Sequence, residues 1–333
     1  MVHDKYYKND DNQEFRTASA SHPLLQHHPQ TMKVPTASIL ATLMAATAVI
    51  AAPTTSLEKR SGDGSVHLAS NDDMAIQKHY LQLSYSAYCS SVIPGGDLES
   101  CPYCDAFDSI KLIKTFKTKK YDTNAMVVRD DERKEVVAVF RGTDSIRGWI
   151  ADFTALPVSY PPVKGAYVHK GFYATYMDVA DEITSVVLDQ AKKYPDYNIA
   201  VTGHSLGGAT SMLGAMDLYQ RGVPAHKLKL YTQGGPRVGN KAFAEYVLST
   251  KIPVTRLINK MDSVPHVPHK FAGFRHPGEE YWIKSNNTTR VCANGLETRK
   301  CSDSVELIAL SFYDHNDYFG LHTEMHSCLG SNN

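Results

Sequence analysis

The sequence has no excess of charge of either sign. Its 333 residues contain 35 lysines and arginines against 35 aspartates and glutamates, so no strong electrostatic field selects a polyanionic or polycationic partner. No basic stripe and no zinc spacing raises the expectation of nucleic-acid binding, and we therefore expect none. What the chain does contain is apolar residues, 42% of the total, which is enough for a sizeable buried core.

The sequence also lacks an apolar run of the about twenty residues that a membrane-spanning helix needs. The apolar segment at residues 37–52 is sixteen residues long, follows a lysine and ends in two alanines. This layout is typical of a secretory signal peptide, which we assign to residues 32–52 in preference to a membrane anchor. Residues 1–31, which are polar and rich in histidine, are expected to be a disordered extension, and Met32 is an alternative start of translation.

A dibasic pair, Lys59-Arg60, lies between this segment and the first periodic stretch of the sequence. Such a pair in an exposed linker is a common processing site. We therefore expect residues 53–60 to be a propeptide remnant and residues 61–333 to form a single folded domain. The predicted product is secreted and extracellular. The six cysteines, an even number, suit the oxidising compartment that such a protein enters.

Hydrophobic periodicity divides the predicted domain into alternating helices and strands. Helices are expected over residues 71–88, 172–194 and 206–219, and strands over residues 123–128, 136–140, 198–202, 227–232 and 253–258. The first two strands are predicted to form a hairpin, and the second of them is almost wholly apolar, which indicates a central position in a sheet. The alternation predicts one α/β domain with a central, mostly parallel sheet flanked by helices.

Residues 203–207 read Gly-His-Ser-Leu-Gly and match the G-x-S-x-G nucleophile elbow. The motif alone occurs by chance, but here a strand precedes it and a helix follows it. The glycines permit a strained turn that would hold the Ser205 hydroxyl at the carboxyl end of the sheet, beside the N–H groups of a helix N-terminus. The alternative is a plain glycine turn with an idle serine. The motif in its context predicts an α/β-hydrolase-type domain.

A nucleophilic serine needs an acid and a histidine base, which follow it in this order in the α/β-hydrolase fold. Asp262 lies just past the strand predicted at 253–258, although a solvated loop aspartate is the alternative. Six histidines follow Asp262, and position in a late loop ranks His315 and His322 above the others without separating them. His204, beside the serine, is expected to pack under the elbow rather than to act as the base.

Several sequence blocks together resemble the fungal class 3 lipases, and most of all the Rhizomucor and Rhizopus triacylglycerol lipases. The blocks are Phe140–Thr143, Gly203–Ala209, Tyr231–Asn240 and Asp314–Gly320, and the likeness extends from about residue 71 to residue 328. The sequence departs from the family at Asn316 and Asp317, because an apolar residue usually follows the histidine. Asp317 places an additional carboxylate near the expected base.

The resemblance implies that Ser205 is the nucleophile, Asp262 the acid and His315 the base. It also implies oxyanion donors at Thr143 and Leu206. The implied reaction forms a covalent acyl-enzyme that water then hydrolyses, and it needs no metal ion and no organic cofactor.

An amphipathic segment follows the first of these blocks. Ile146, Trp149, Ile150 and Phe153 are spaced to share one helical face, away from Arg147. An ordinary core helix is the alternative, but the resemblance identifies the segment as a helical lid over the site. Burying its apolar face against lipid would stabilise the open state by about 1.5–3 kcal/mol per large side chain. The predicted partner is therefore a triglyceride or other lipid at an interface, bound by a monomer through peripheral contact only.

The resemblance also implies three disulfides and leaves other features open. The implied pairs are Cys89–Cys328, Cys101–Cys104 and Cys292–Cys301. The Cys-x-x-Cys spacing of the second pair is also that of redox or zinc motifs, but a small loop closure is the preferred interpretation in a secreted hydrolase. Asn286 and Asn287 each begin an N-x-T sequence and are candidate glycan sites.

Two other functions are considered beside the lipase. An esterase of soluble esters, such as a feruloyl esterase of the same superfamily, or an acyltransferase would carry the same triad. The feruloyl esterases have polar lids, against which Trp149 and Ile150 argue. A non-catalytic lipid-binding protein on this scaffold would be expected to have lost a member of the triad, and none is evidently lost.

Overall fold

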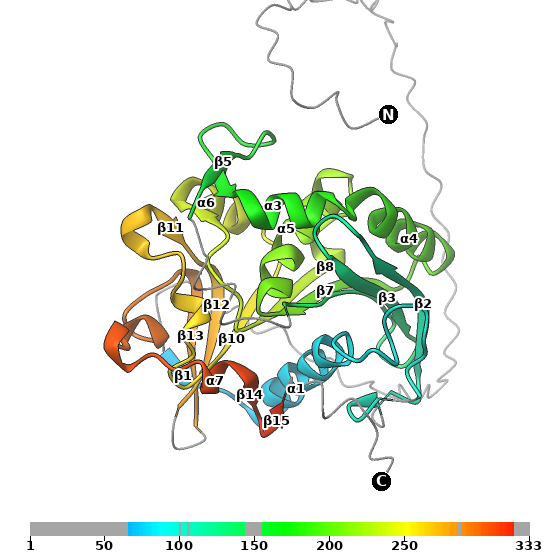
Figure 1. Cartoon of the computed structure of the whole chain (residues 1–333), viewed down its shortest axis with the longest axis horizontal. Coiled ribbons are helices and arrows are strands. Elements are labelled where there is room, and N and C mark those ends of the chain that lie inside the picture. The colour runs from blue at the N-terminus through cyan, green and yellow to red at the C-terminus, as the bar shows by residue number, and fades with distance from the viewer. Residues whose placement is uncertain (1–65, 100, 105–106, 144–154, 285–287, 323–333) are drawn as a thin grey trace, which may run out of the picture. The chain divides into compact units, whose positions relative to one another are not determined.

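The folded region is built on one large mixed sheet (Figure 1), seen in a computed structural model that describes residues 66–99, 101–104, 107–143, 155–284 and 288–322. Nine strands form this sheet. In spatial order they are β1 (Val66–Leu68), β13 (Thr289–Leu296), β12 (Pro277–Ile283), β10 (Val254–Asn259), β8 (Leu228–Gln233), β7 (Asn198–His204), β4 (Glu135–Phe140), β3 (Asn124–Asp130) and β2 (Ile110–Lys117).

The centre of the sheet is parallel and its margins are antiparallel. Strands β4, β7, β8, β10 and β12 run in the same direction, whereas β2, β3, β13 and β1 pair antiparallel with their neighbours. Every residue of β4 is buried, as expected for a strand covered on both faces. The prediction of an α/β domain with a central, mostly parallel sheet is therefore confirmed, and so is the hairpin of β3 and β4.

Helices cover both faces of the sheet (Figure 1). Helix α1 (Asn71–Ser86) packs on one face within one apolar cluster. Helices α3 (Lys170–Met177), α4 (Ala180–Lys193), α5 (Leu206–Gln220) and α6 (Lys241–Ser249) contribute to a second cluster on the other face. Among the described residues, no helix has both the length and the apolar character needed to span a membrane.

One predicted helix is in fact two. The chain over 172–194 forms α3 and α4, which are separated at Asp178 and Val179. Both helices bury apolar side chains in the same cluster, including Tyr176 of α3 and Ile183 of α4. Because the change of direction takes only two residues, the apolar spacing continues across it, and periodicity alone cannot detect the break.

Short elements complete the fold around the sheet. A four-stranded sheet consists of β11 (Phe274–Arg275), β9 (Gly239–Asn240), β6 (Tyr167–His169) and β5 (Pro157–Ser159). Near the end of the described chain, α7 (Tyr313–Asn316) leads into the hairpin of β14 (Asp317–Tyr318) and β15 (Leu321–His322). The complete 3-10 helices among the described residues are Ala225–Lys227, Val264–His266, Lys270–Ala272, Ser302–Ser304 and Leu307–Ala309.

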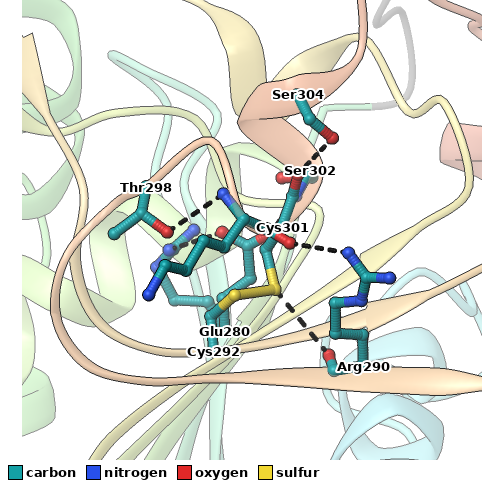
Figure 2. Close-up of a disulfide and its surroundings, with 9 residues drawn as sticks. Glu280, Arg290, Cys292, Thr298, Cys301, Ser302 and Ser304 are labelled. Atoms are coloured by element: carbon teal, nitrogen blue, oxygen red, sulfur yellow. Dashed lines mark hydrogen bonds and ion pairs between the residues drawn. A yellow bond between two sulfur atoms is a disulfide. The ribbon is translucent and has the colours of Figure 1, made fainter. Parts of the chain in front are cut away.

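Two of the three implied disulfides, Cys101–Cys104 and Cys292–Cys301, are present, and the third involves Cys328, which lies outside the described residues. Figure 2 shows the second disulfide, which ties the segment after β13 back to that strand. The Ser302 N–H beside it donates to the Glu280 carboxylate over 2.8 Å. This bridge and this bond hold the segment after β13 against the edge of the parallel strands.

Two buried arginine–glutamate pairs lie in this part of the fold. Arg256 of β10 donates to Glu280 of β12 over 2.9 Å, and Arg237 donates to Glu297 over 2.7 Å, with all four side chains only 3% exposed. Both nitrogens of the Arg237 fork reach the carboxylate, which is the strong bidentate geometry. A buried charge of this kind destabilises the fold severely when its partner is removed.

The Glu297 pair is expected to make stability depend on acid. Burial alone would raise the pKa of Glu297, but the bonds from Arg237 and the nearby charges of Arg237 and Arg256 lower it from 4.5 to about 2. Because the folded-state pKa is the lower one, this stabilisation is present above the unfolded value of 4.5 and is lost as pH falls toward about 2. The difference corresponds to about 3 kcal/mol.

We therefore expect Glu297→Gln to unfold more easily at neutral pH and to lose less stability on acidification than the wild type. Urea unfolding at a series of pH values measures both effects. Glu245→Gln, which changes an exposed glutamate of α6, is the control and should leave the pH dependence unaltered. A Glu297→Gln variant whose acid dependence matches that of the wild type would contradict the assignment.

Candidate active site

The elbow at Ser205 is strained, as the G-x-S-x-G motif predicts. Ser205 joins β7 to α5 with φ 60° and ψ −130°, a backbone conformation that a non-glycine residue rarely adopts. Its N–H donates to the Gln233 carbonyl of β8 over 2.9 Å. Its hydroxyl does not cap α5, and the buried Oγ has no hydrogen-bond partner among the described residues. The turn thus buries a serine hydroxyl that makes no structural hydrogen bond to the described residues.

The glycines of the motif are required by close backbone contacts. A Cβ atom on Gly203 would lie 2.3 Å from the Gly207 carbonyl oxygen, and one on Gly207 would lie 2.1 Å from the Phe140 carbonyl oxygen. Gly142, just after β4, approaches the elbow from the other side, since its Cβ would be 2.9 Å from the Ser205 Cβ. These contacts bring the end of β4 against the turn that carries Ser205.

Asp262 and His315 form a buried pair. Asp262 follows β10 and is 0% exposed, and His315 lies in α7 and is also 0% exposed. The His315 Nδ1–H donates to the Asp262 carboxylate, whose two oxygens lie 2.9 Å away. The other ring nitrogen, Nε2, is buried and has no partner among the described residues. The imidazole is therefore oriented by a carboxylate on one side and keeps a nitrogen available on the other.

Two residues that the sequence did not indicate fix this pair. The Tyr318 hydroxyl, three residues after His315, donates to Asp262 Oδ2 over 2.6 Å. Burial, followed by the charge of Asp262, raises the pKa of Tyr318 well above its usual value, so the hydroxyl stays a donor. Gly234, after β8, has φ +58°, and its Cβ would lie 2.8 Å from Asp262 Oδ2 and 3.0 Å from His315 Nδ1. Only a glycine lets the β8 loop pass this close to the pair.

His204 packs beneath the elbow, as expected from the sequence. Its ring stacks on that of His315 with centroids 4.6 Å apart. Its Nε2–H donates to the His315 carbonyl over 3.0 Å, and Nδ1 lies 2.9 Å from the Tyr88 hydroxyl. Burial, with a smaller contribution from His315, lowers the pKa of His204 well below 6.5. A neutral His204 supports the neighbouring ring and has both nitrogens engaged, so it is not placed as a base.

The remaining predicted residues fall in several places. His322, the alternative base, is exposed in β15 and is therefore not part of the buried pair. Leu206 is the first residue of α5, and Thr143 follows Gly142 after β4. The predicted lid, the glycan candidates and Cys328 lie outside the described residues. Among the residues that the structure describes, no group of three or more histidine, cysteine or acidic side chains is arranged to hold a metal ion.

Comparison with known proteins finds relatives over most of the chain. A family model described as Lipase (class 3) matches residues 137–272. A lipase of Rhizomucor miehei is 51% identical over 275 residues, which are 81% of this chain and 75% of the relative. The secreted mono- and diacylglycerol lipase 1 of Fusarium solani is 32% identical over 260 residues, 74% of this chain and 76% of the relative.

Solved structures give the same result. A triacylglycerol lipase whose catalytic centre is formed by a serine protease triad matches with a TM-score of 0.76 and 51% identity, over 79% of this chain and 100% of that one. A fungal lipase–inhibitor complex that served as a model for interfacial activation matches with a TM-score of 0.75 and the same identity and coverage. The parallel sheet, the strained elbow and the buried pair define an α/β hydrolase. More narrowly, the chain belongs to the class 3 lipase family, and it is a lipase, a carboxylic ester hydrolase.

Proposed function

We propose that Ser205, His315 and Asp262 are the catalytic triad of a triacylglycerol lipase. The observation that carries the proposal is the buried Asp262–His315 pair, in which Nε2 has no partner among the described residues. The pair lies against Gly234, and the preceding residue, Gln233 at the end of β8, binds the Ser205 N–H. His315 Nε2 takes the proton from Ser205 Oγ as the oxygen attacks the ester carbonyl. The same nitrogen returns the proton to the leaving alcohol, and water then hydrolyses the acyl-enzyme. Asp262 holds the imidazole tautomer and stabilises its charged form.

Two residues, Leu206 and Thr143, are proposed to stabilise the tetrahedral oxyanion. The Leu206 N–H opens α5, where the helix N-terminus carries partial positive charge. Thr143 follows Gly142, which packs against the elbow, and it would supply its N–H and hydroxyl from the opposite side. Each such donor contributes about 3 kcal/mol to transition-state stabilisation in comparable sites.

The substrate is proposed to be a triacylglycerol at a lipid–water interface. Support comes from the 51% identity to a triacylglycerol lipase and to the complex used as a model for interfacial activation. The segment with Ile146, Trp149, Ile150 and Phe153 would act as the lid, with Arg147 off the apolar face. In water the lid would hide both its apolar face and the site. An oil surface would bury that face and favour the open state, with the protein acting as a monomer in peripheral contact with the lipid.

We also propose that the protein is secreted. Relatives at 32% identity include a secreted mono- and diacylglycerol lipase, and the disulfides suit an oxidising compartment. The proposed arrangement has an extension at 1–31, a signal peptide at 32–52, a propeptide remnant at 53–60 and the mature lipase at 61–333.

Substrate preference tests the proposed function. The protein should release fatty acid from emulsified triolein and should hydrolyse methyl ferulate far more slowly. With a short-chain triglyceride, the rate should rise steeply as the substrate passes its solubility limit, because only then does an interface exist. Trp149→Ala should weaken that rise. A smooth rate curve and an unaffected Trp149→Ala variant would refute the lid, and a preference for methyl ferulate would favour an esterase.

A further inference from the structure

The loop that carries Asp262 is held by a group of three buried residues, Arg237, His276 and Glu297. The carbonyl oxygens of four consecutive residues in this loop, 265–268, accept hydrogen bonds from His276 and Arg237. His276 Nε2 lies 2.9 Å from the Pro265 carbonyl. The other three carbonyls bond to Arg237: Nη1 donates to residues 266 and 268 over 2.5 and 3.0 Å, and its backbone N–H donates to residue 267 over 2.9 Å.

Glu297 in turn fixes both donors. Its carboxylate accepts the Arg237 fork over 2.7–3.1 Å and the backbone N–H of His276 over 3.1 Å. Asp303 lies 3.4 Å from the same guanidinium group. Burial lowers the pKa of His276 well below 6.5. Because a carbonyl only accepts, the neutral ring carries its hydrogen on Nε2. Arg237 and Glu297 are each 3% exposed, and His276 is buried, so water does not compete for these bonds.

This group also connects the two loops of the active site. Arg237 is three residues after Gly234, which touches the Asp262–His315 pair, and four after Gln233, which binds the Ser205 N–H. On the other side, the loop it holds begins at Asp262, whose carboxylate accepts the Val264 N–H over 2.9 Å. A shift of the Arg237 guanidinium group would therefore move the loop after β8 (residues 234–237) relative to the loop that begins at Asp262 (residues 262–268).

We propose that Arg237, with Glu297 and His276, is a positioning residue of the hydrolytic reaction that sets the place of the Asp262 carboxylate. The inference depends on the proposed role of Asp262. Arg237 does not touch the reacting atoms. It acts by fixing the loop, so that the carboxylate meets His315 Nδ1 in the orientation that activates Ser205.

The test compares two buried arginines that differ in what they hold. Arg237→Lys keeps the charge but cannot form the bidentate bond and both carbonyl bonds. We expect its kcat on a soluble ester, per site labelled by a fluorophosphonate, to fall by about 10- to 100-fold with little change in KM. The acid limb of its kcat/KM profile should move to lower pH, because the His315 imidazolium loses its carboxylate. Arg256→Lys, in the matched pair with Glu280, should lose thermal stability but keep its kcat.

Glu297→Gln decides the matter if Arg237→Lys does not fold, because it keeps the arginine and the shape of the group. The inference is overturned if Glu297→Gln, and any Arg237→Lys protein that folds, keep the wild-type kcat per labelled site and the wild-type pH profile. It is also overturned if Arg256→Lys loses as much kcat as they do. Asp262→Asn separates this inference from the proposed function. If that variant is fully active, the triad itself is wrong, whereas an inactive Asp262→Asn beside normal Arg237→Lys and Glu297→Gln refutes only the positioning role.

Discussion

Replacement of Asp262 by asparagine is expected to lower kcat by about 10⁴-fold without unfolding the protein. The carboxylate accepts from His315 Nδ1, from the Tyr318 hydroxyl and from the Val264 N–H. The Val264 N–H binds Oδ1 and the Tyr318 hydroxyl binds Oδ2, but an asparagine has only one oxygen. If that oxygen keeps the bond from the Val264 backbone, the NH₂ group takes the place of Oδ2 and faces His315 Nδ1. The ring would then have to accept at Nδ1 and carry its hydrogen on Nε2, so it could not take the proton from Ser205. Initial rates on a soluble ester, with circular dichroism for folding, measure the effect.

Asp130→Asn is the matched control for this variant. Asp130 is 2% exposed, and its carboxylate accepts the Glu132 and Arg133 N–H groups in the turn after β3. Asp130→Asn therefore removes the charge of a buried carboxylate that is far from Ser205 in the sequence. We expect lower stability and an unchanged kcat. If Asp130→Asn lost activity as severely as Asp262→Asn, a general effect of removing buried charge would explain both results.

Gly234→Ala is expected to reduce activity by about 100-fold or more. The new methyl group would lie 2.8 Å from Asp262 Oδ2, 2.9 Å from the Tyr318 hydroxyl and 3.0 Å from His315 Nδ1. None of these atoms can retreat easily, because each is buried and bonded to another. The methyl group must therefore push the carboxylate and the imidazole apart. The positive φ of residue 234 adds a cost of about 1 kcal/mol for any side chain.

Alanine variants of two other glycines separate the effect of the close contacts of the new methyl group from the effect of the positive φ. Gly235→Ala introduces a methyl group next door, where the nearest atoms are 3.4 Å or more away. Gly222→Ala has an unfavourable φ of +96° but no atom within 4 Å, so it reports backbone strain alone. Both variants should retain kcat, and Gly222→Ala should lose some thermal stability. Activity loss in either variant equal to that of Gly234→Ala would show that proximity to the Asp262–His315 pair is not the cause.

Four strands of the parallel centre, β4, β7, β8 and β10, could be predicted from the sequence because each is a short segment with several apolar residues, bounded by turns. β3 was also predicted, as the partner of β4 in a hairpin, but β1, β2, β12 and β13 were not. In β12 and β13, Pro277, Gly278 and Gly295 interrupt the pattern, and burial in β13 does not alternate regularly. The ends of these strands are set by pairing with distant segments, such as Val66 with Cys292. Local periodicity carries no information on such contacts.

The elbow was evident in the sequence because its requirements are local, whereas the histidine was not. His315 and His322 were equivalent by position, and only the family resemblance preferred His315. The structure separates them by contact, since His315 meets Asp262 across 53 residues of sequence while His322 is exposed. Tyr318 and Gly234 serve this contact. No spacing rule indicates them, although a glycine pair directly after a buried strand is a signal that a backbone must approach something closely.

The central claim is that the Ser205 hydroxyl attacks the ester. Titration of fatty-acid release from emulsified triolein by Ser205→Ala tests it most directly, with Ser211→Ala as the control because Ser211 is another buried serine on α5 whose hydroxyl has no described partner. We expect Ser205→Ala to lose about 10⁶-fold in rate and to resist fluorophosphonate labelling, while Ser211→Ala keeps both. Release of fatty acid by Ser205→Ala at a rate near that of the wild type would contradict the account.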